Sequence, residues 1–182
     1  MKLSRLLLLC VTIVTVGCTG LPDDIEPVPA LDIGKYKGTW YEIARLDHSF
    51  ERGLSDVTAE YIPNPDGSVT VVNRGYSAEE GGWEEADGHA LPVEGSAAGH
   101  LKVSFFGPFY ASYVVFQLDE DYEQAYVTGF NRDYLWLLSR SPVIDDSELE
   151  AFKAVAREQG FDLDELIVVD QSRNLPEGAP AN

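Results

Sequence analysis

"GTWYEIARLDHSFERGL", residues 38–54, is the stretch that decides the fold of this 182-residue chain. Gly38 and Trp40 stand two residues apart, and apolar and polar side chains then alternate as far as Leu46. This alternation predicts a β-strand with one buried face. The polar and charged residues after Leu46 predict a long loop before the next strand.

The chain from there to residue 140 has the pattern of short strands separated by turn residues. Asp66-Gly67, for example, is a strong hairpin signal between two apolar runs. After a first strand at 39–46, we expect strands at 57–62, 68–76, 83–93, 99–106, 110–118, 122–130 and 134–140. Eight strands joined by short turns favour an up-and-down sheet that closes into a barrel, because closure removes the exposed edges.

The hydrophobic period changes after residue 140. Pro142 and the polar cluster 145–147 provide a helix start, and Gly160 provides a helix end. A short apolar run at 163–170 predicts a last strand. We therefore expect an all-β fold, an eight-stranded up-and-down antiparallel β-barrel with one C-terminal α-helix and a short ninth strand. Residues 172–182 are expected to form a flexible tail.

The first seventeen residues have the composition of a signal peptide. Lys2 and Arg5 precede an apolar run from Leu6 to Val16, which is too short for a transmembrane helix of about 20 residues. The run ends in "TVGCTG", which resembles the lipobox of bacterial lipoproteins although Thr15 stands where Leu is usual. The resemblance implies lipidation of Cys18. The alternative is an ordinary cleaved signal followed by an incidental cysteine.

Residues 18–33 are expected to form a lipidated N-terminus and a proline-rich linker. An extended proline-rich chain rises about 3.1 Å per residue, so this linker would hold the domain roughly 35 Å from its anchor. In the lipoprotein sorting pattern that the sequence resembles, Thr19 after the cysteine implies the outer membrane. The only other cysteine, Cys10, lies in the signal, so the mature chain has no disulfide.

Charge and motif content exclude several classes of function. The formal net charge of −18, about −20 without the signal, disfavours binding to nucleic acid or to an anionic membrane surface. The histidines His48, His89 and His100 are not spaced as a metal motif, and no Gly-x-Ser-x-Gly esterase motif occurs. We therefore expect a binding protein with no cofactor, no metal and no catalytic residues.

The strand pattern and the opening stretch together resemble the lipocalin family over residues 34–171. "GTWYEIARLDHSFERGL", "LKVSFFGPFY" and "NRDYLWLLSR" are similar to the bacterial subgroup, outer-membrane lipoproteins close to apolipoprotein D. The family's second signature, a turn that resembles Thr-Asp-Tyr, falls at Glu120-Asp121-Tyr122, where Glu120 stands in place of the threonine. The resemblance implies that Gly38, Trp40 and Arg140 form the barrel floor, with the guanidinium packed over the indole.

The resemblance also implies the ligand and the location. The expected ligand is a fatty acid or lysophospholipid, stored or transported at the periplasmic face of the outer membrane. Strand alternation does not decide which face points inward, so the cavity candidates are provisional: Glu42, Ala59, Tyr61, Phe105, Tyr113, Val115 and Trp136. The alternatives are a structural envelope lipoprotein with a filled barrel, or a lipid-modifying enzyme on the same scaffold. The sequence does not decide whether the protein forms a homodimer.

Overall fold

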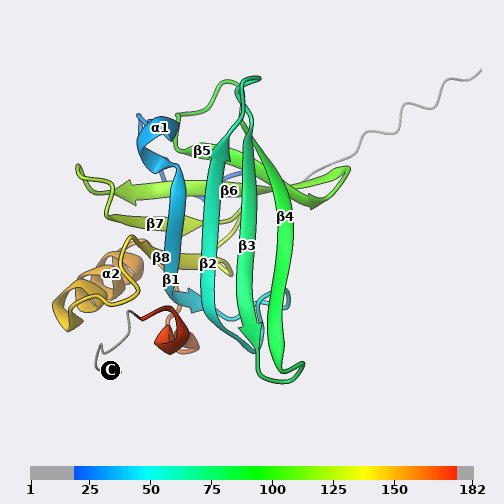
Figure 1. Ribbon diagram of the computed structural model, residues 1–182. Coiled ribbons are helices and arrows are strands. Elements are labelled where there is room, and N and C mark those ends of the chain that lie inside the picture. The colour runs from blue at the N-terminus through cyan, green and yellow to red at the C-terminus, as the bar shows by residue number, and fades with distance from the viewer. Residues whose placement is uncertain (1–18, 176–182) are drawn as a thin grey trace, which may run out of the picture.

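Nine strands form one antiparallel sheet in the computed structural model, which describes residues 19–175 (Figure 1). The sheet order is β2-β3-β4-β5-β6-β7-β8-β1-β9, and the additional pairing of β2 with β1 closes the barrel. The strands are β1 Gly38–Leu46, β2 Leu54–Pro63, β3 Val69–Ser77, β4 Gly82–Pro92, β5 His100–Phe106, β6 Phe109–Leu118, β7 Gln124–Thr128, β8 Leu135–Ser139 and β9 Leu166–Val168. The predicted fold class is confirmed.

The connections alternate between the two ends of the barrel because neighbouring strands are antiparallel. The closed end carries the short helix α1 Ile33–Tyr36 and the turns β2–β3, β4–β5 and β6–β7 (Figure 1). The open end carries the turns β1–β2, β3–β4, β5–β6 and β7–β8. The strand β7 begins later than expected, because Tyr122 has a left-handed φ of 61° and belongs to the β6–β7 turn.

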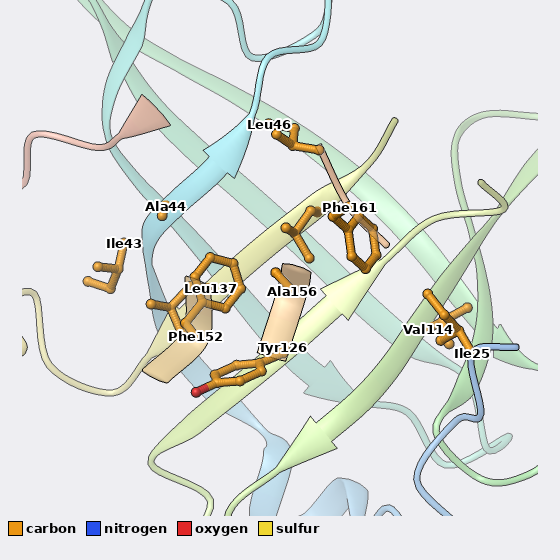
Figure 2. Close-up of a cluster of buried hydrophobic side chains, with 11 residues drawn as sticks. Ile25, Ile43, Ala44, Leu46, Val114, Tyr126, Leu137, Phe152, Ala156 and Phe161 are labelled. Carbon is orange, nitrogen blue, oxygen red and sulfur yellow. The ribbon is translucent and has the colours of Figure 1, made fainter. Parts of the chain in front are cut away.

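The helix α2 Asp146–Glu158 covers part of the outside of the barrel. It begins with a capping box between Asp145 and Glu148. Its buried residues, Phe152 and Ala156, belong to one cluster with Tyr126, Leu135 and Leu137 of β7 and β8 (Figure 2). This packing decides which face of those strands points outward, and the alternate residues therefore face the barrel interior.

Residues 20–32 do not form the extended spacer that the prolines predicted. Ile25 is buried against Val114, and the Val28 amide donates to the carbonyl of Val115 on β6 at 2.9 Å. The Val28 carbonyl in turn accepts from Gly99 at 3.0 Å. The linker prediction is wrong here because the segment carries apolar residues that bury on the barrel, and its backbone finds partners there. The signal peptide 1–17 and Cys18 lie outside the described residues.

The expected flexible tail is likewise wrong for its first residues. A 3₁₀ turn, η1 Ser172–Asn174, packs beside β2. The Arg173 amide and guanidinium donate to the fully buried Asp56 carboxylate at 2.6 and 2.9 Å. A buried carboxylate requires such partners, so this turn is fixed to the barrel. Residues 176–182 of the predicted tail are outside the described residues.

The closed end is held by Arg140, at the end of β8. Its guanidinium carbon lies 4.0 Å from the centre of the Trp40 ring, and Trp40 is fully buried. The guanidinium also donates to five backbone carbonyls: those of Thr39 at 2.7 Å, Lys35 at 2.9 Å, Tyr36 and Lys37 at 3.0 Å, and Tyr122 at 3.2 Å. Gly38 adopts a φ of +88°, which favours glycine where the chain turns from α1 into β1.

Replacing Arg140 with lysine should test this arrangement. Arg140→Lys keeps the charge but loses the planar fork of donors, so we expect the free energy of unfolding to fall by about 2–3 kcal/mol. Urea denaturation would measure it. The matched control is Arg74→Lys, because Arg74 is exposed and its guanidinium carbon lies 3.8 Å from the centre of the Trp83 ring. That control should cost less than about 1 kcal/mol. Equal losses would contradict a special role for the carbonyl contacts.

Candidate ligand-binding site

The barrel interior has an apolar middle section with accessible surface. Ala59, Val103, Phe105, Tyr113 and Trp136 pack against the interior cluster but are only half-buried. Side chains that point inward and keep accessible surface indicate that they do not fill the barrel completely. The fully buried part of this section is made by Val71, Ala90, Val115, Val127 and Leu138.

Gly88 contributes to this section by lacking a side chain. A Cβ atom at this position would lie 2.7 Å from a ring carbon of Phe105, so the glycine makes room for the ring. The pairing of β4 with β3 continues through Gly88 without a register shift. The glycine therefore has a packing role and does not mark a bulge.

Three tyrosine hydroxyls meet above the floor. The Tyr113 hydroxyl lies 2.7 Å from the hydroxyls of both Tyr36 and Tyr61. Burial raises the pKa of all three phenols, so each keeps its proton at neutral pH. Trp40 closes the layer below, since its ring centre lies 4.7 Å from that of Tyr36 and its indole N–H donates to the Tyr36 carbonyl at 2.8 Å.

A buried group of charges lies toward the open end. Arg45 Nη1 donates to Glu42 Oε1 at 2.6 Å, and Arg45 Nη2 donates to the carbonyls of Glu51 at 2.9 Å and Leu54 at 3.1 Å. Glu42, Arg45 and Glu51 are all buried. Glu42 and Arg45 are three residues apart, so a regular strand would point them to opposite faces. The pairing of β1 with β8 shifts register between Glu42 and Ala44, and this irregularity brings both side chains together.

The loop after β1 adds an imidazole and an aromatic stack to these charges. His48 Nε2 lies 2.9 Å from Glu51 Oε2, although the geometry is not that of an aligned hydrogen bond. The indole N–H of Trp136 donates to the same oxygen at 3.1 Å. The His48 ring stacks on Phe50 with centroids 3.9 Å apart, and Tyr134 stacks on Trp136 at 6.0 Å. We call Glu42, Arg45, His48, Glu51 and Trp136 the polar mouth cluster.

The pKa values of the two carboxyl groups in this cluster are shifted in opposite directions. Burial, helped by the nearby Glu51, raises the pKa of Glu42 well above its usual value despite the contact with Arg45. Burial alone would also raise the pKa of Glu51, but His48, the Trp136 N–H and Arg45 outweigh it and hold that pKa below its usual value. The cluster therefore keeps its negative charge mainly on Glu51.

Several buried polar atoms in the interior have no hydrogen-bond partner in the described part of the chain. They include Arg45 Nε, His48 Nδ1 and Asn73 Oδ1. An unpartnered buried polar atom is costly, at about 1–3 kcal/mol each, unless water or a ligand satisfies it. These atoms are buried, so a bound polar group that reached them would be stabilised.

The structure places the predicted cavity residues unevenly. Ala59, Tyr61, Phe105, Tyr113, Val115 and Trp136 all belong to the interior cluster, whereas Glu42 is held by Arg45. From the sequence, the loop "DHSFERGL" was a candidate for part of the mouth, but neither Tyr36 nor a single residue of that loop was named as a cavity residue. Glu51 and His48 come from a loop, where no periodicity indicates direction, and Tyr36 lies in a four-residue helix.

The barrel interior is closed at one end by Trp40 and Arg140 and has half-buried apolar side chains in its middle section. Within residues 19–175, no group of three or more His, Cys, Asp or Glu side chains is placed to hold a metal ion. An eight-stranded barrel of this size has room for side chains or one small ligand. Fold and interior together define an eight-stranded antiparallel β-barrel closed at one end, the architecture of small ligand-binding barrels.

Comparison with known proteins agrees. Residues 31–171 match the family model described as a lipocalin-like domain. The chain is 55% identical over 166 residues to outer membrane lipoprotein Blc of Vibrio cholerae, covering 91% of this chain and 96% of that protein. It is 47% identical to Blc of Escherichia coli K12, covering 82% and 85%, and 30% identical to bovine apolipoprotein D, covering 80% and 79%. Insecticyanin from the tobacco hornworm superposes with a TM-score of 0.68, covering 85% and 88%, and at 22% identity it shows the fold alone.

The chain belongs to the lipocalin family, in its bacterial outer membrane lipoprotein branch related to apolipoprotein D. The predicted family is therefore confirmed. As a lipocalin of this branch it is a binding protein and not an enzyme.

The pKa values of the mouth cluster predict opposite pH dependences for two variants. Glu51→Gln should lower the free energy of unfolding by roughly 1–3 kcal/mol at neutral pH. Because the pKa of Glu51 is depressed, this stabilisation is present above the usual value of 4.5 and should disappear as the pH falls below it.

Glu42 has a raised pKa, so the folded protein loses stability as the pH rises above 4.5, and Glu42→Gln should remove that loss. Urea denaturation across pH would measure both. Parallel curves for the two variants would contradict the assignment.

Proposed function

We propose that this lipocalin binds single-chain lipids, fatty acids or lysophospholipids, in its barrel and stores or transports them at the outer membrane. The observation that carries the proposal is the order of surfaces along the interior. A floor closed by Trp40 and Arg140 is followed by an apolar section and then by the polar mouth cluster. A lipid with one chain and one polar end has the same order.

The apolar section supplies the binding free energy for an acyl chain. Each buried methylene contributes about 0.8 kcal/mol, and no directional contact is needed. The half-buried aromatic residues Phe105 and Trp136 would cover the chain. An eight-stranded barrel has room for one small ligand, which favours a lipid with one acyl chain over a lipid with two.

The polar end of the lipid would stay at the mouth. There Arg45 Nε and His48 Nδ1 are buried without partners, and a phosphate or carboxylate oxygen would satisfy them. The carboxylate of Glu51 would attract an ammonium group, and Trp136 would offer its ring face. A zwitterionic head group uses both kinds of contact, so a lysophospholipid fits this end better than a free fatty acid.

A steric block distinguishes a ligand-binding barrel from a filled structural one. Ala59→Trp places a large side chain in the half-buried interior, and we expect the Kd for a lysophospholipid to rise more than tenfold, since excluding only two methylenes costs about 1.6 kcal/mol. The matched control is Glu60→Trp, at the neighbouring exposed position of β2. It should bind as the wild type does. Native mass spectrometry with added lipid would measure occupancy.

Two results would count against the proposal. A wild-type protein that takes up no lipid at high micromolar concentration would favour the structural alternative. Equal binding by the two tryptophan variants would place the lipid outside the barrel.

We further propose that Cys18 carries the lipid anchor and that the barrel lies on the periplasmic face of the outer membrane. No helix within residues 19–175 is long and apolar enough to cross a membrane. The lipobox-like "TVGCTG" and the relatives named outer membrane lipoprotein support a lipid anchor. Two or three acyl chains anchor a protein stably, whereas one does so only weakly.

Serine substitutions test the anchor. Cys18→Ser should move the protein from the membrane fraction to the soluble periplasmic fraction, because the thiol that receives the lipid is gone. Cys10→Ser is the control, since Cys10 lies within the predicted signal and should leave fractionation unchanged. Membrane retention of the Cys18 variant would count against lipidation.

A further inference from the structure

The exposed aromatic side chains of the described chain lie in or beside loops at the open end of the barrel. Phe106 and Phe109 flank the β5–β6 turn with 81% and 68% of their surface exposed, and Phe50 of the β1–β2 loop is 56% exposed. Trp83, at the β3–β4 turn, is exposed to 39%. Among residues 19–175 the other exposed large hydrophobic residues are aliphatic: Leu21, Ile62, Val143 and Val168. Phe106 and Phe109 pair across the β5–β6 turn, and adjacent exposed apolar side chains of this kind mark surfaces that contact a membrane or another protein.

The β5–β6 turn also carries no charged side chain. Residues 104–112, "SFFGPFYAS", contain no Asp, Glu, Lys or Arg in a protein whose net charge is −18. In Figure 1 this turn projects away from the end that carries α1. An uncharged aromatic turn on an otherwise acidic protein is suited to the interfacial layer of a bilayer, where aromatic rings are favoured.

The N-terminal segment leads from the closed end back to this same end. The Asp32 amide donates to the Tyr122 hydroxyl in the β6–β7 turn at 3.0 Å, at the closed end. Further toward the N-terminus, the Asp23 carbonyl accepts from Arg132 of the β7–β8 turn at 2.6 Å, at the open end. Leu21 lies beside Phe130 and Arg132 of the same turn, in a hollow on the surface. The segment therefore runs along the barrel and ends near its mouth.

The last fixed point of this segment is close to the aromatic turn. The Gly20 carbonyl accepts from the Ser112 hydroxyl at 2.6 Å, and Ser112 is three residues from Phe109 on β6, about 10 Å along a strand. Cys18 is two residues before Gly20, at most about 7 Å along an extended chain. A lipid on Cys18 would therefore enter the bilayer beside the open end.

We infer that the open end of the barrel docks on the bilayer to which the protein is anchored, with Phe106, Phe109 and Phe50 in the interfacial layer. The inference rests on the proposed lipidation of Cys18. Docked in this way, the mouth exchanges single-chain lipids directly with the membrane surface. The acidic charge of the protein makes a zwitterionic bilayer the preferred surface, and an anionic one weakens docking.

A fluorescence quenching experiment tests the orientation. The full-length lipoprotein is produced lipidated and reconstituted into phosphatidylcholine vesicles, with one cysteine introduced as Phe106→Cys or, at the closed end, as Pro65→Cys. The mature chain has no other unmodified thiol, because Cys10 is removed with the signal and Cys18 is lipidated. Each cysteine carries an environment-sensitive fluorophore. Phospholipids with a quencher on the acyl chain should reduce the emission at position 106 at least twofold and leave position 65 unchanged.

Three other outcomes would overturn the inference. Equal quenching at the two positions, or none at either, would show that the open end does not face the bilayer. Protection of position 106 from a water-soluble quencher without quenching by lipid would show that a second copy of the chain covers this face. Lipoprotein that does not float with the vesicles would remove the anchor on which the inference rests.

Lipid exchange on the same samples separates docking from ligand binding. The double variant Phe106→Asp with Phe109→Asp should slow transfer of a fluorescent fatty acid from vesicles to the barrel at least fivefold and keep its Kd within twofold. An unchanged rate would overturn the inference. If neither the wild type nor any variant binds the fatty acid, the proposed function fails. If position 106 is still quenched in that case, the docking inference stands.

Discussion

The contact of Arg140 with Trp40 and five carbonyls is the interaction on which the arrangement of this barrel depends. One guanidinium joins the end of β8 to α1, to the start of β1 and to the β6–β7 turn. The helix α1 and the start of β1 are more than 100 residues from Arg140 along the chain, so their meeting has a substantial entropic cost. A planar group with five donors can satisfy that many carbonyls at once, which an ammonium cannot do. With this end closed, only the other end can admit a ligand.

At the closed end the guanidinium of Arg140 has hydrogen-bond partners. In the interior, by contrast, some buried polar groups lack them. Burying Glu42, Arg45 and Glu51 costs desolvation free energy that apolar residues of similar size would avoid. The cluster compensates in part through the Arg45 contacts with Glu42 and with two carbonyls. Arg45 Nε and His48 Nδ1 have no partner among the described residues, so this compensation is incomplete within the described chain. The polar end of a bound ligand would supply the missing partners.

The N-terminal segment connects the barrel to its surroundings. A loose linker would leave the orientation of the domain on a membrane undetermined, because a flexible chain permits all rotations. A segment fixed by Ile25, Val28 and the carbonyls of Gly20 and Asp23 instead gives the chain a definite course as far as Gly20. The proposed attachment at Cys18 would then lie at the same end as the aromatic turn and the mouth.

The sequence by itself determined the strands, the helix and the family, because alternation, capping residues and the opening "GTW" are local signals that the fold does not override. Tertiary structure decided the rest. Only the packing of α2 on Leu135 and Leu137 shows that Trp136 and Leu138 face inward. Only the register shift in β1 brings Glu42 and Arg45 together, against the period of two. The proline-rich segment packs on β6, and Arg173 reaches Asp56, because buried groups take their partners from any part of the chain that comes within reach. A pattern along the sequence specifies which residues can be buried. The direction of a side chain in a loop, in a bulge or in the N-terminal segment is decided only by the neighbours that the fold supplies.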